Sequence, residues 1–348
     1  MRSGLIFRLS AVLLGVCLGL VLGELGLRIV WQPRPLPWFL SRYFVPDDDV
    51  MFVPAHLAGA EPFDIDPALP TVVALGDSFT AGYPVKRSDS YPAQLREILA
   101  DHGIEANVVN LGIGASGTGT QLRYFELSVA RLAPDMVIWQ LYSNDVWNGC
   151  DQPLYAIEGD ELVRLDATRN WRYRRRWFYD AVPLPRSVKD RSYLVRSVLQ
   201  SLPVFWNAEV PKAYDTRPED WALEKISLSL QRMDRLAQRH GFLVHNVLVA
   251  PEATWLAAGS DSSTDHWADG QYRRLRTILE SRGDFIDAEP GLLAPAACGP
   301  ELFVGSERDF ARPGDHHLSE LGYRRLAELV AKHVVAELQA RHSSRTQP

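Results

Sequence analysis

The chain has little cysteine, and what it has forms no C-x-x-C pair. Only Cys17, Cys150 and Cys298 occur among 348 residues, which argues against a structural zinc site. An excess of basic residues is also missing: the formal net charge is −6, so no overall positive field indicates a nucleic-acid partner. The remaining composition, 46% hydrophobic and 23% charged, is that of a globular protein with room for one large domain and an appendage.

Charge is nearly absent from one stretch near the N-terminus. Between Arg8 and Arg28 lie nineteen residues whose only charge is Glu24, close to the roughly 20 residues that a helix needs to cross a bilayer. Arg2 and Arg8 precede this stretch, and positively charged flanks stay on the cytoplasmic side. The sequence therefore predicts a transmembrane signal anchor over residues 1–31, with the rest of the chain exported to the periplasmic or extracellular side.

A cleaved signal peptide is the alternative interpretation of this stretch. Cleavage near Gly23, after a passable small-residue site, would give a secreted protein, but the apolar run continues beyond that point and favours a retained anchor. Residues 32–70, rich in proline and aromatic residues, are predicted to be a linker that leads into the domain. The folded domain is then expected over residues 71–340, with a disordered tail over 341–348.

The stretch TVVALGDSFTAG, residues 71–82, places a serine at the end of a buried strand. Its apolar run stops at Gly76 and is followed by Asp77 and Ser78, the pattern of a strand that ends in a tight turn. Ligands of open α/β sheets bind at the carboxyl edge of the strands, and a helix start there leaves N–H groups free to face an anion. Ser78 is therefore the candidate nucleophile. The alternative is that Asp77 and Ser78 only cap the following helix.

Strands and helices alternate along most of the chain. Strands are predicted at residues 71–75, 105–110, 135–142, 242–250 and 285–288, separated by amphipathic helices. This alternation predicts an α/β fold with a five-stranded parallel sheet that is covered by helices on both faces.

Regularity fails between residues 150 and 219, where an irregular insertion is expected. The segment is crowded with arginine and aromatic residues, above all Arg172 to Arg176 with Trp171, Tyr173 and Trp177. Three interpretations of this cluster stay open: a solvated lid surface, a site for an anionic substrate, or a surface for lipid headgroups.

A second polar motif, Asp315-His316-His317, stands just before the last predicted helix, which begins at Ser319. In an extended segment Asp315 and His317 point to the same side, and His316 points to the other. A carboxylate can then hold one imidazole nitrogen while the other nitrogen faces a serine, as in a base that deprotonates a nucleophile. A solvated loop or an adventitious metal site is the alternative.

Taken together, these motifs resemble the SGNH, or GDSL, hydrolase family. Gly76-Asp77-Ser78-Phe79 is similar to its nucleophile block, and the glycine loop after Asn110 to its second block. Asn144-Asp145 is similar to the third block, and Asp315-x-His317 to the last. The resemblance spans roughly residues 71 to 338 and implies a flavodoxin-like α/β/α sandwich.

The resemblance also implies roles for individual residues. Ser78 would be the nucleophile, His317 the general base and Asp315 the group that orients this base. An oxyanion hole would use the Ser78 N–H, the Gly117 N–H and the Asn144 side chain.

Two positions depart from the usual family pattern. The acid Asp315 lies two residues before His317 rather than three, a variant that also occurs in the family. In the second block the usual donor position is Ala115, and Gly117 is preferred because it fits the glycine pattern better.

The sequence thus predicts an exported, membrane-anchored serine ester hydrolase that works through an acyl-enzyme without metal or cofactor. Its partners would be a small-molecule or glycan-linked ester and, through the N-terminal helix, the membrane. Two alternatives stay open. The same triad could serve an O-acyltransferase or O-acetylesterase of an envelope polysaccharide, or the domain could be a non-catalytic binding module on the same fold.

Export would also place Cys150 and Cys298 in a compartment where disulfides persist. Each lies in a loop that must approach Ser78 if the site assembles, so the two are predicted to pair. The bond would close a loop of about 150 residues. In the chain-entropy model this raises the free energy of unfolding by over ~4 kcal/mol. Two separately buried thiols are the alternative.

Overall fold

The computed structural model describes residues 2–30, 40–55, 65–151, 154–201, 218–250, 263–283, 285–288 and 317–346, together with residues 57 and 63. The chain divides into two compact units. Met1–Ala55 and Thr168–Ala208 form one, which we call the N-terminal unit. His56–Ala167 and Glu209–Pro348 form the other, which we call the sheet unit.

The sheet unit is built around a five-stranded parallel sheet with the strand order β4-β3-β5-β8-β9. Its strands are β3 (Thr71–Gly76), β4 (Asn107–Gly112), β5 (Met136–Leu141), β8 (Leu243–Leu248) and β9 (Ile286–Asp287). Numbered along the chain, these five strands lie in the order 2-1-3-4-5, which is the flavodoxin-like arrangement. The predicted α/β fold and the five-stranded parallel sheet are therefore confirmed.

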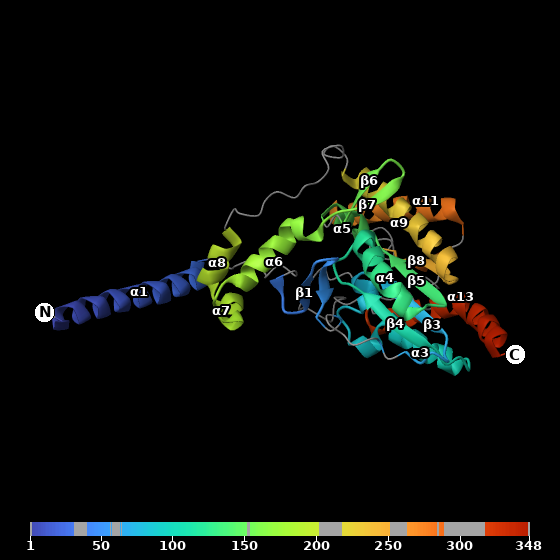
Figure 1. The fold of residues 1–348 in the computed structure, drawn as a ribbon, viewed down its shortest axis with the longest axis horizontal. Coiled ribbons are helices and arrows are strands. Elements are labelled where there is room, and N and C mark those ends of the chain that lie inside the picture. Colours follow the sequence, from blue (N-terminus) through green and yellow to red (C-terminus); the bar gives the residue numbers. More distant parts are fainter. Residues whose placement is uncertain are drawn as a thin grey trace. The chain divides into compact units, whose positions relative to one another are not determined.

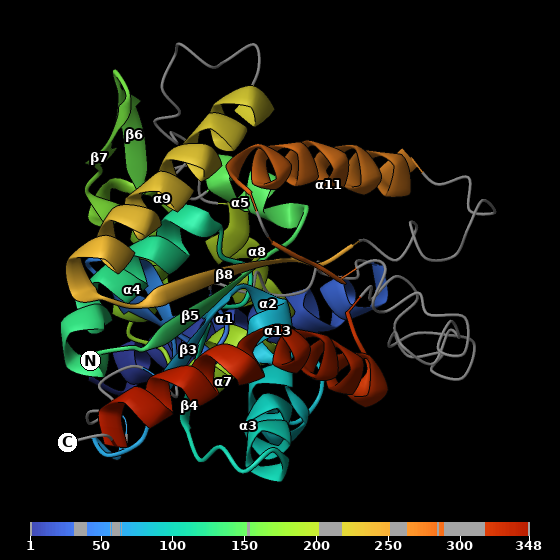
Figure 2. The same ribbon diagram turned by 90° about the vertical axis from the view of Figure 1, so that its right-hand side faces the viewer.

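Helices cover both faces of this sheet (Figure 2). On one face α3 (Tyr91–Asp101) packs against α13 (Glu320–Thr346), and on the other α4 (Thr118–Leu132) packs against α9 (Pro218–His240). Helix α13 shows why these helices pack as they do: its apolar residues recur at helical spacing and form one buried stripe. The stripe consists of Tyr323, Ala327, Val330, Val334 and Leu338.

Shorter elements complete the sheet unit. Helix α2 (Ser78–Ala81) follows β3, and α5 (Asn144–Asp151) follows β5. An antiparallel hairpin, β6 (Tyr155–Glu158) with β7 (Glu161–Arg164), contacts α9, as does α11 (Ser263–Arg282). A single turn of 3-10 helix lies at Arg87–Asp89, and another, Ala167–Arg169, begins at the last residue of this part of the unit and continues into the N-terminal unit.

The N-terminal unit joins two parts of the chain that are far apart in sequence (Figure 1). Its first part holds α1 (Arg2–Val30) and the hairpin β1 (Phe44–Asp47) with β2 (Met51–Pro54). Its second part holds α6 (Trp171–Ala181), α7 (Arg186–Arg191) and α8 (Tyr193–Ser201). Within α1, residues Ser10–Val30 are long and apolar enough to cross a membrane, with a mean hydropathy of 2.1.

Two stretches contain regular structure that sequence patterns did not predict. The stretch predicted as a linker holds the β1–β2 hairpin, whose turn forms because Asp47 Oδ1 accepts the backbone N–H groups of Asp49 and Val50 at 2.9 and 3.0 Å. Within residues 150–219, predicted as an irregular insertion, the described residues hold the β6–β7 hairpin and helices α6 to α8. These elements are too short, and too polar, to show a clear period.

The end of the last helix also differs from the prediction. Helix α13 runs to Thr346, whereas the sequence places a disordered tail from residue 341. The apolar stripe stops at Leu338, but no glycine or proline occurs between there and Pro348, so nothing in the local sequence ends the helix.

Candidate active site

The chain leaves β3 through a turn that leaves no space for a side chain at Gly76. A Cβ there would lie 2.2 Å from Thr80 Oγ1. Asp77 then caps α2, since its Oδ1 accepts the Phe79 N–H at 2.9 Å. Ser78 is the first residue of α2, so its backbone N–H belongs to the helical turn whose N–H groups have no acceptor within the helix.

A histidine from the far end of the chain meets this serine. His317 Nε2 lies 2.8 Å from Ser78 Oγ, the distance of a hydrogen bond between a nucleophile and its base. The imidazole stacks on Phe79 and meets the edge of Tyr83, with 5.0 Å between ring centroids in both cases. These rings hold the imidazole against the serine.

Gly117 and Asn144 flank Ser78 because of the strand order. Gly117 follows β4 and Asn144 follows β5, and these two strands lie on either side of β3, which leads into Ser78. A Cβ on Gly117 would lie 2.8 Å from the backbone nitrogen of Gly149 in α5, so only glycine allows this approach. Asn144 is half-buried, and its Oδ1 has no hydrogen-bond partner within the described part of the chain.

Three predicted residues, Asp315, His316 and Cys298, lie outside the described residues. The orienting role of Asp315 therefore stays a prediction, as does the Cys150–Cys298 disulfide. Cys150 itself is half-buried in α5, and burial raises the pKa of its thiol.

Comparison with known proteins decides the family. The chain matches the GDSL-like lipase/acylhydrolase family over residues 74–325. It belongs to this family. The resemblance carried by the four motifs is confirmed, and with it the class of enzyme, an ester hydrolase.

Individual relatives are distant from this GDSL-family chain. An arylesterase from Vibrio mimicus is 33% identical over 94 residues, which are 27% of this chain and 47% of the relative, so the match spans about half of that protein. The acetyl xylan esterase AlAXEase has a TM-score of 0.44 at 17% identity, covering 76% of this chain and 99% of its own. A family 3 carbohydrate esterase from Clostridium thermocellum has a TM-score of 0.41 at 12% identity, covering 79% and 99%.

The aspartate of the GDSL motif is one of two buried acids close to the serine. Burial raises the pKa of Asp77, and it raises the pKa of Asp145 well above its usual range, where the charge of Asp77 acts in the same direction. Asp145 is held by the Tyr142 N–H at 2.8 Å and by Gln121 Nε2 at 2.9 Å. The Coulombic interaction with His317 opposes this upward shift of the Asp77 pKa. Sequence patterns predict no role for Asp145, although it directly follows Asn144.

The sequence also does not predict the burial of one lysine, Lys225. Lys225 of α9 donates from Nζ to the Gly149 carbonyl oxygen at 2.5 Å and lies 3.9 Å above the Trp221 ring. Burial lowers the pKa of this lysine to about 7. Because Gly149 belongs to the helix that begins with Asn144, Lys225 fixes the position of α5. The only sequence signal is a lysine among the apolar residues of an amphipathic helix.

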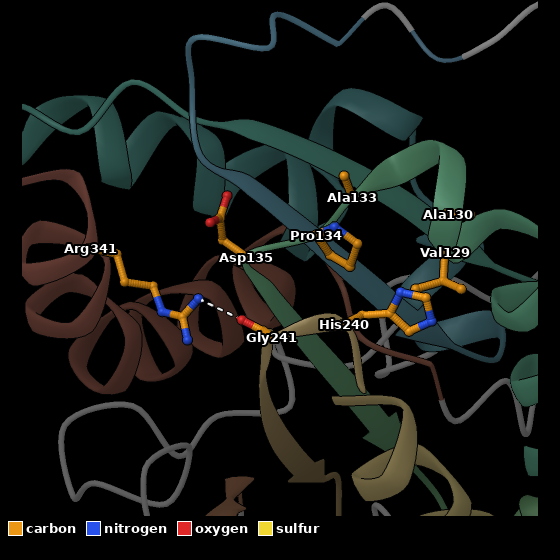
Figure 3. A pocket seen from close by; sticks show the side chains of 8 residues that line it. All are labelled: Val129, Ala130, Ala133, Pro134, Asp135, His240, Gly241 and Arg341. Atoms are coloured by element: carbon orange, nitrogen blue, oxygen red, sulfur yellow. Dashed lines mark hydrogen bonds between the residues drawn. The ribbon is translucent and has the colours of Figure 1, made fainter. Parts of the chain in front are cut away.

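No metal site accompanies these residues in the part of the chain that the structure describes: it contains no group of three or more His, Cys, Asp or Glu side chains placed to hold an ion. A cavity of about 430 Å³ lies elsewhere, lined by Asp135, His240, Gly241 and Arg341 among others (Figure 3). Asp135 and Gly241 precede β5 and β8, so this cavity is at the amino edge of the sheet, opposite the Ser78 edge.

Proposed function

We propose that this chain hydrolyses carboxylic esters through an acyl-enzyme on Ser78. Ser78 Oγ attacks the ester carbonyl carbon while His317 Nε2 takes its proton, and the alcohol leaves with that proton. Water then attacks the acyl-serine while His317 Nε2 takes one of its protons, and His317 returns that proton to Ser78 Oγ as the acid leaves. Asp315 orients His317, and the Ser78 and Gly117 N–H groups with the Asn144 side chain stabilise the oxyanion.

The observation that carries the proposal is the 2.8 Å contact between His317 Nε2 and Ser78 Oγ. A helix cap, the alternative role of Ser78, does not need a histidine from a segment 239 residues away. The cap of α2 is in fact supplied by Asp77. The half-buried amide of Asn144 and the close approach of Gly117 to α5 support an oxyanion site beside the serine.

Hydrolysis of p-nitrophenyl acetate by the full chain in detergent tests this mechanism. We expect Ser78→Ala to lower kcat by about 10³-fold or more and to abolish labelling by a fluorophosphonate. Ser88→Ala is the matched control, because Ser88 is exposed in the 3-10 turn Arg87–Asp89, and it should keep both activities. Full turnover by Ser78→Ala would exclude the acyl-enzyme.

We also propose that α1 stays attached as a membrane anchor, with the sheet unit exported. The apolar length of Ser10–Val30 and the basic residues Arg2 and Arg8 before it support this topology. Carbonate extraction of membranes and intact-mass measurement test it: the chain should stay in the membrane with its N-terminus complete. A soluble product that begins near Glu24 would show that the segment is a cleaved signal peptide.

A further inference from the structure

We propose that α6, α7 and α8 form a surface that binds the anionic headgroups of the membrane into which α1 inserts. The proposal rests on the membrane anchoring proposed above, but not on the esterase chemistry. It selects one of the interpretations left open by the sequence of the arginine-rich segment.

Charge is the first argument. Residues 168–201 contain nine basic and two acidic residues, an excess of seven positive charges in a chain whose formal net charge is −6. Basic segments next to a membrane helix are attracted to anionic lipids, and the attraction falls off within a Debye length of the surface. This segment can therefore act on lipids only if it is held close to the membrane.

The second argument is that α1 itself holds the segment. Glu24 accepts hydrogen bonds from Ser192 Oγ at 2.8 Å and from the N–H groups of Tyr193 and Leu194 at 3.0 Å, and so caps α8. Arg28 adds a bond from Nη2 to the Arg191 carbonyl oxygen at 3.3 Å.

The position of Glu24 along α1 fixes the level of α8. At about 1.5 Å per residue, Glu24 lies about 9 Å from the end of α1 at Val30. The start of α8 is therefore held beside the last two turns of the apolar helix, where the hydrocarbon core gives way to the headgroup layer. Figure 1 shows α8 beside this end of α1.

The side chains exposed on the segment suit such an interface. Trp177 is 64% exposed and Val198 is 53% exposed, and the basic side chains of Arg174 and Arg191 are exposed as well. Tryptophan enters the headgroup region with its ring, and arginine pairs with phosphate groups.

Other basic residues of the segment have a structural role. Arg176 and Lys189 are buried and donate to backbone carbonyl oxygens within the unit. They hold the helices together and are not available to lipid. The distinction identifies Arg174, Arg191 and Trp177 as the residues to test.

Hydrogen exchange of the full chain in nanodiscs tests the proposal. One set of nanodiscs contains phosphatidylcholine alone, and the other contains about 30% phosphatidylglycerol. We expect amides of residues 171–198 to exchange about tenfold more slowly with phosphatidylglycerol, and amides of β3 and β5 to exchange equally in both. Equal exchange of residues 171–198 in the two lipids would overturn the proposal.

Matched variants locate the effect. Arg174→Gln/Arg191→Gln should lose most of the slowing, whereas Arg235→Gln/Arg239→Gln, two exposed arginines of α9, should keep it. Trp177→Ala, made in the otherwise unaltered chain, should reduce the slowing. Loss of slowing in the α9 variant alone would contradict the assignment.

Two separate readouts distinguish this proposal from the proposed membrane anchor and from the proposed esterase activity. Protection of the amides of α1 in both lipids reports insertion of the anchor, and p-nitrophenyl acetate hydrolysis reports the esterase. If soluble glycerol phosphate slows exchange in phosphatidylcholine nanodiscs as much as phosphatidylglycerol does, the surface binds a free anion and the lipid proposal is wrong.

Discussion

Each of the two units of this protein is stabilised internally by a different kind of interaction. In the sheet unit, every residue of β3 and β5 is buried, and the helices contribute apolar stripes to a common core. In the N-terminal unit, charged side chains bond to backbone atoms of other segments. The principal bonds run from Lys189 to the Tyr179 and Val182 carbonyl oxygens, from Arg176 to that of Ser41, from Arg186 to that of Leu40, and to Glu24 from the Tyr193 and Leu194 N–H groups.

Size explains this difference. A small body buries a smaller fraction of its surface than a large one, so its apolar core contributes less. Charge-assisted hydrogen bonds are stronger than neutral ones, and they also satisfy the helix ends of α6 and α8 that would otherwise need solvent or caps. We therefore expect the stability of the sheet unit to depend most on the shape of its side chains. The stability of the N-terminal unit should depend most on their charge.

The largest effect is expected from a methyl group at Gly112. A Cβ there would lie 2.1 Å from the Ala81 backbone nitrogen, and a backbone atom cannot move aside as a side chain can. Gly112→Ala should cost about 3 kcal/mol of unfolding free energy and should lower activity, because Ala81 belongs to the helix that begins with Ser78. Urea unfolding followed by tryptophan fluorescence measures the first effect.

Gly270→Ala is the control for this substitution. It adds the same methyl group inside α11, with nothing within 4 Å of the new Cβ, and should stabilise the protein by about 0.5–1 kcal/mol. Similar unfolding free energies for the two variants would show that close packing does not determine the stability of the sheet unit.

Removal of the buried lysine of the N-terminal unit should have the next largest effect. Lys189→Met leaves the Tyr179 and Val182 carbonyl oxygens without this donor, at a cost of about 1–3 kcal/mol. Hydrogen exchange should accelerate in α6 and stay unchanged in β3. Lys332→Met, at an exposed position of α13, should leave both unchanged, and slow exchange in α6 of Lys189→Met would contradict our comparison.

The buried lysine of the sheet unit should make the free energy of unfolding depend on pH. Lys225 has a pKa of about 7 in the folded chain against 10.5 for an ordinary lysine. Between these values the unfolded state binds more protons, so the unfolding free energy rises with pH, by about 1 kcal/mol from pH 7 to pH 8. Urea unfolding at both pH values should show this rise relative to Lys225→Met. The same pH dependence in both proteins would exclude Lys225 as its cause.

The parallel sheet was predictable from sequence because its strands are apolar runs, and two of them, β3 and β5, are buried on both faces. Buried strands read as continuous apolar runs, and the polar residues that follow them, Ser78 and Asn144, mark the edge where the site forms. Pairing Ser78 with His317 needed the resemblance to a family, since 239 residues separate them and local patterns carry no information at that distance.

Apart from helix α1, which the sequence predicts, the N-terminal unit was not predictable, for a related reason. Its contacts join residues 40–55 to 168–201 through single side chains such as Arg176 and Arg186, and an arginine that bonds to a distant carbonyl looks in sequence like any solvated arginine. The same applies to Lys225 and Asp145, whose burial depends on neighbours from other elements.

The smallest effect should come from a histidine–glutamate hydrogen bond, which joins two side chains rather than a side chain and the backbone. His245 Nε2 lies 2.8 Å from Glu337 Oε2, and the Glu337 side chain is 44% exposed. Because solvent screens such a pair, Glu337→Gln should change the unfolding free energy by less than about 0.5 kcal/mol. Urea unfolding at one pH measures this against Lys189→Met. If Glu337→Gln lowers the unfolding free energy more than Lys189→Met does, hydrogen bonds to the backbone do not explain how the charged residues stabilise the N-terminal unit.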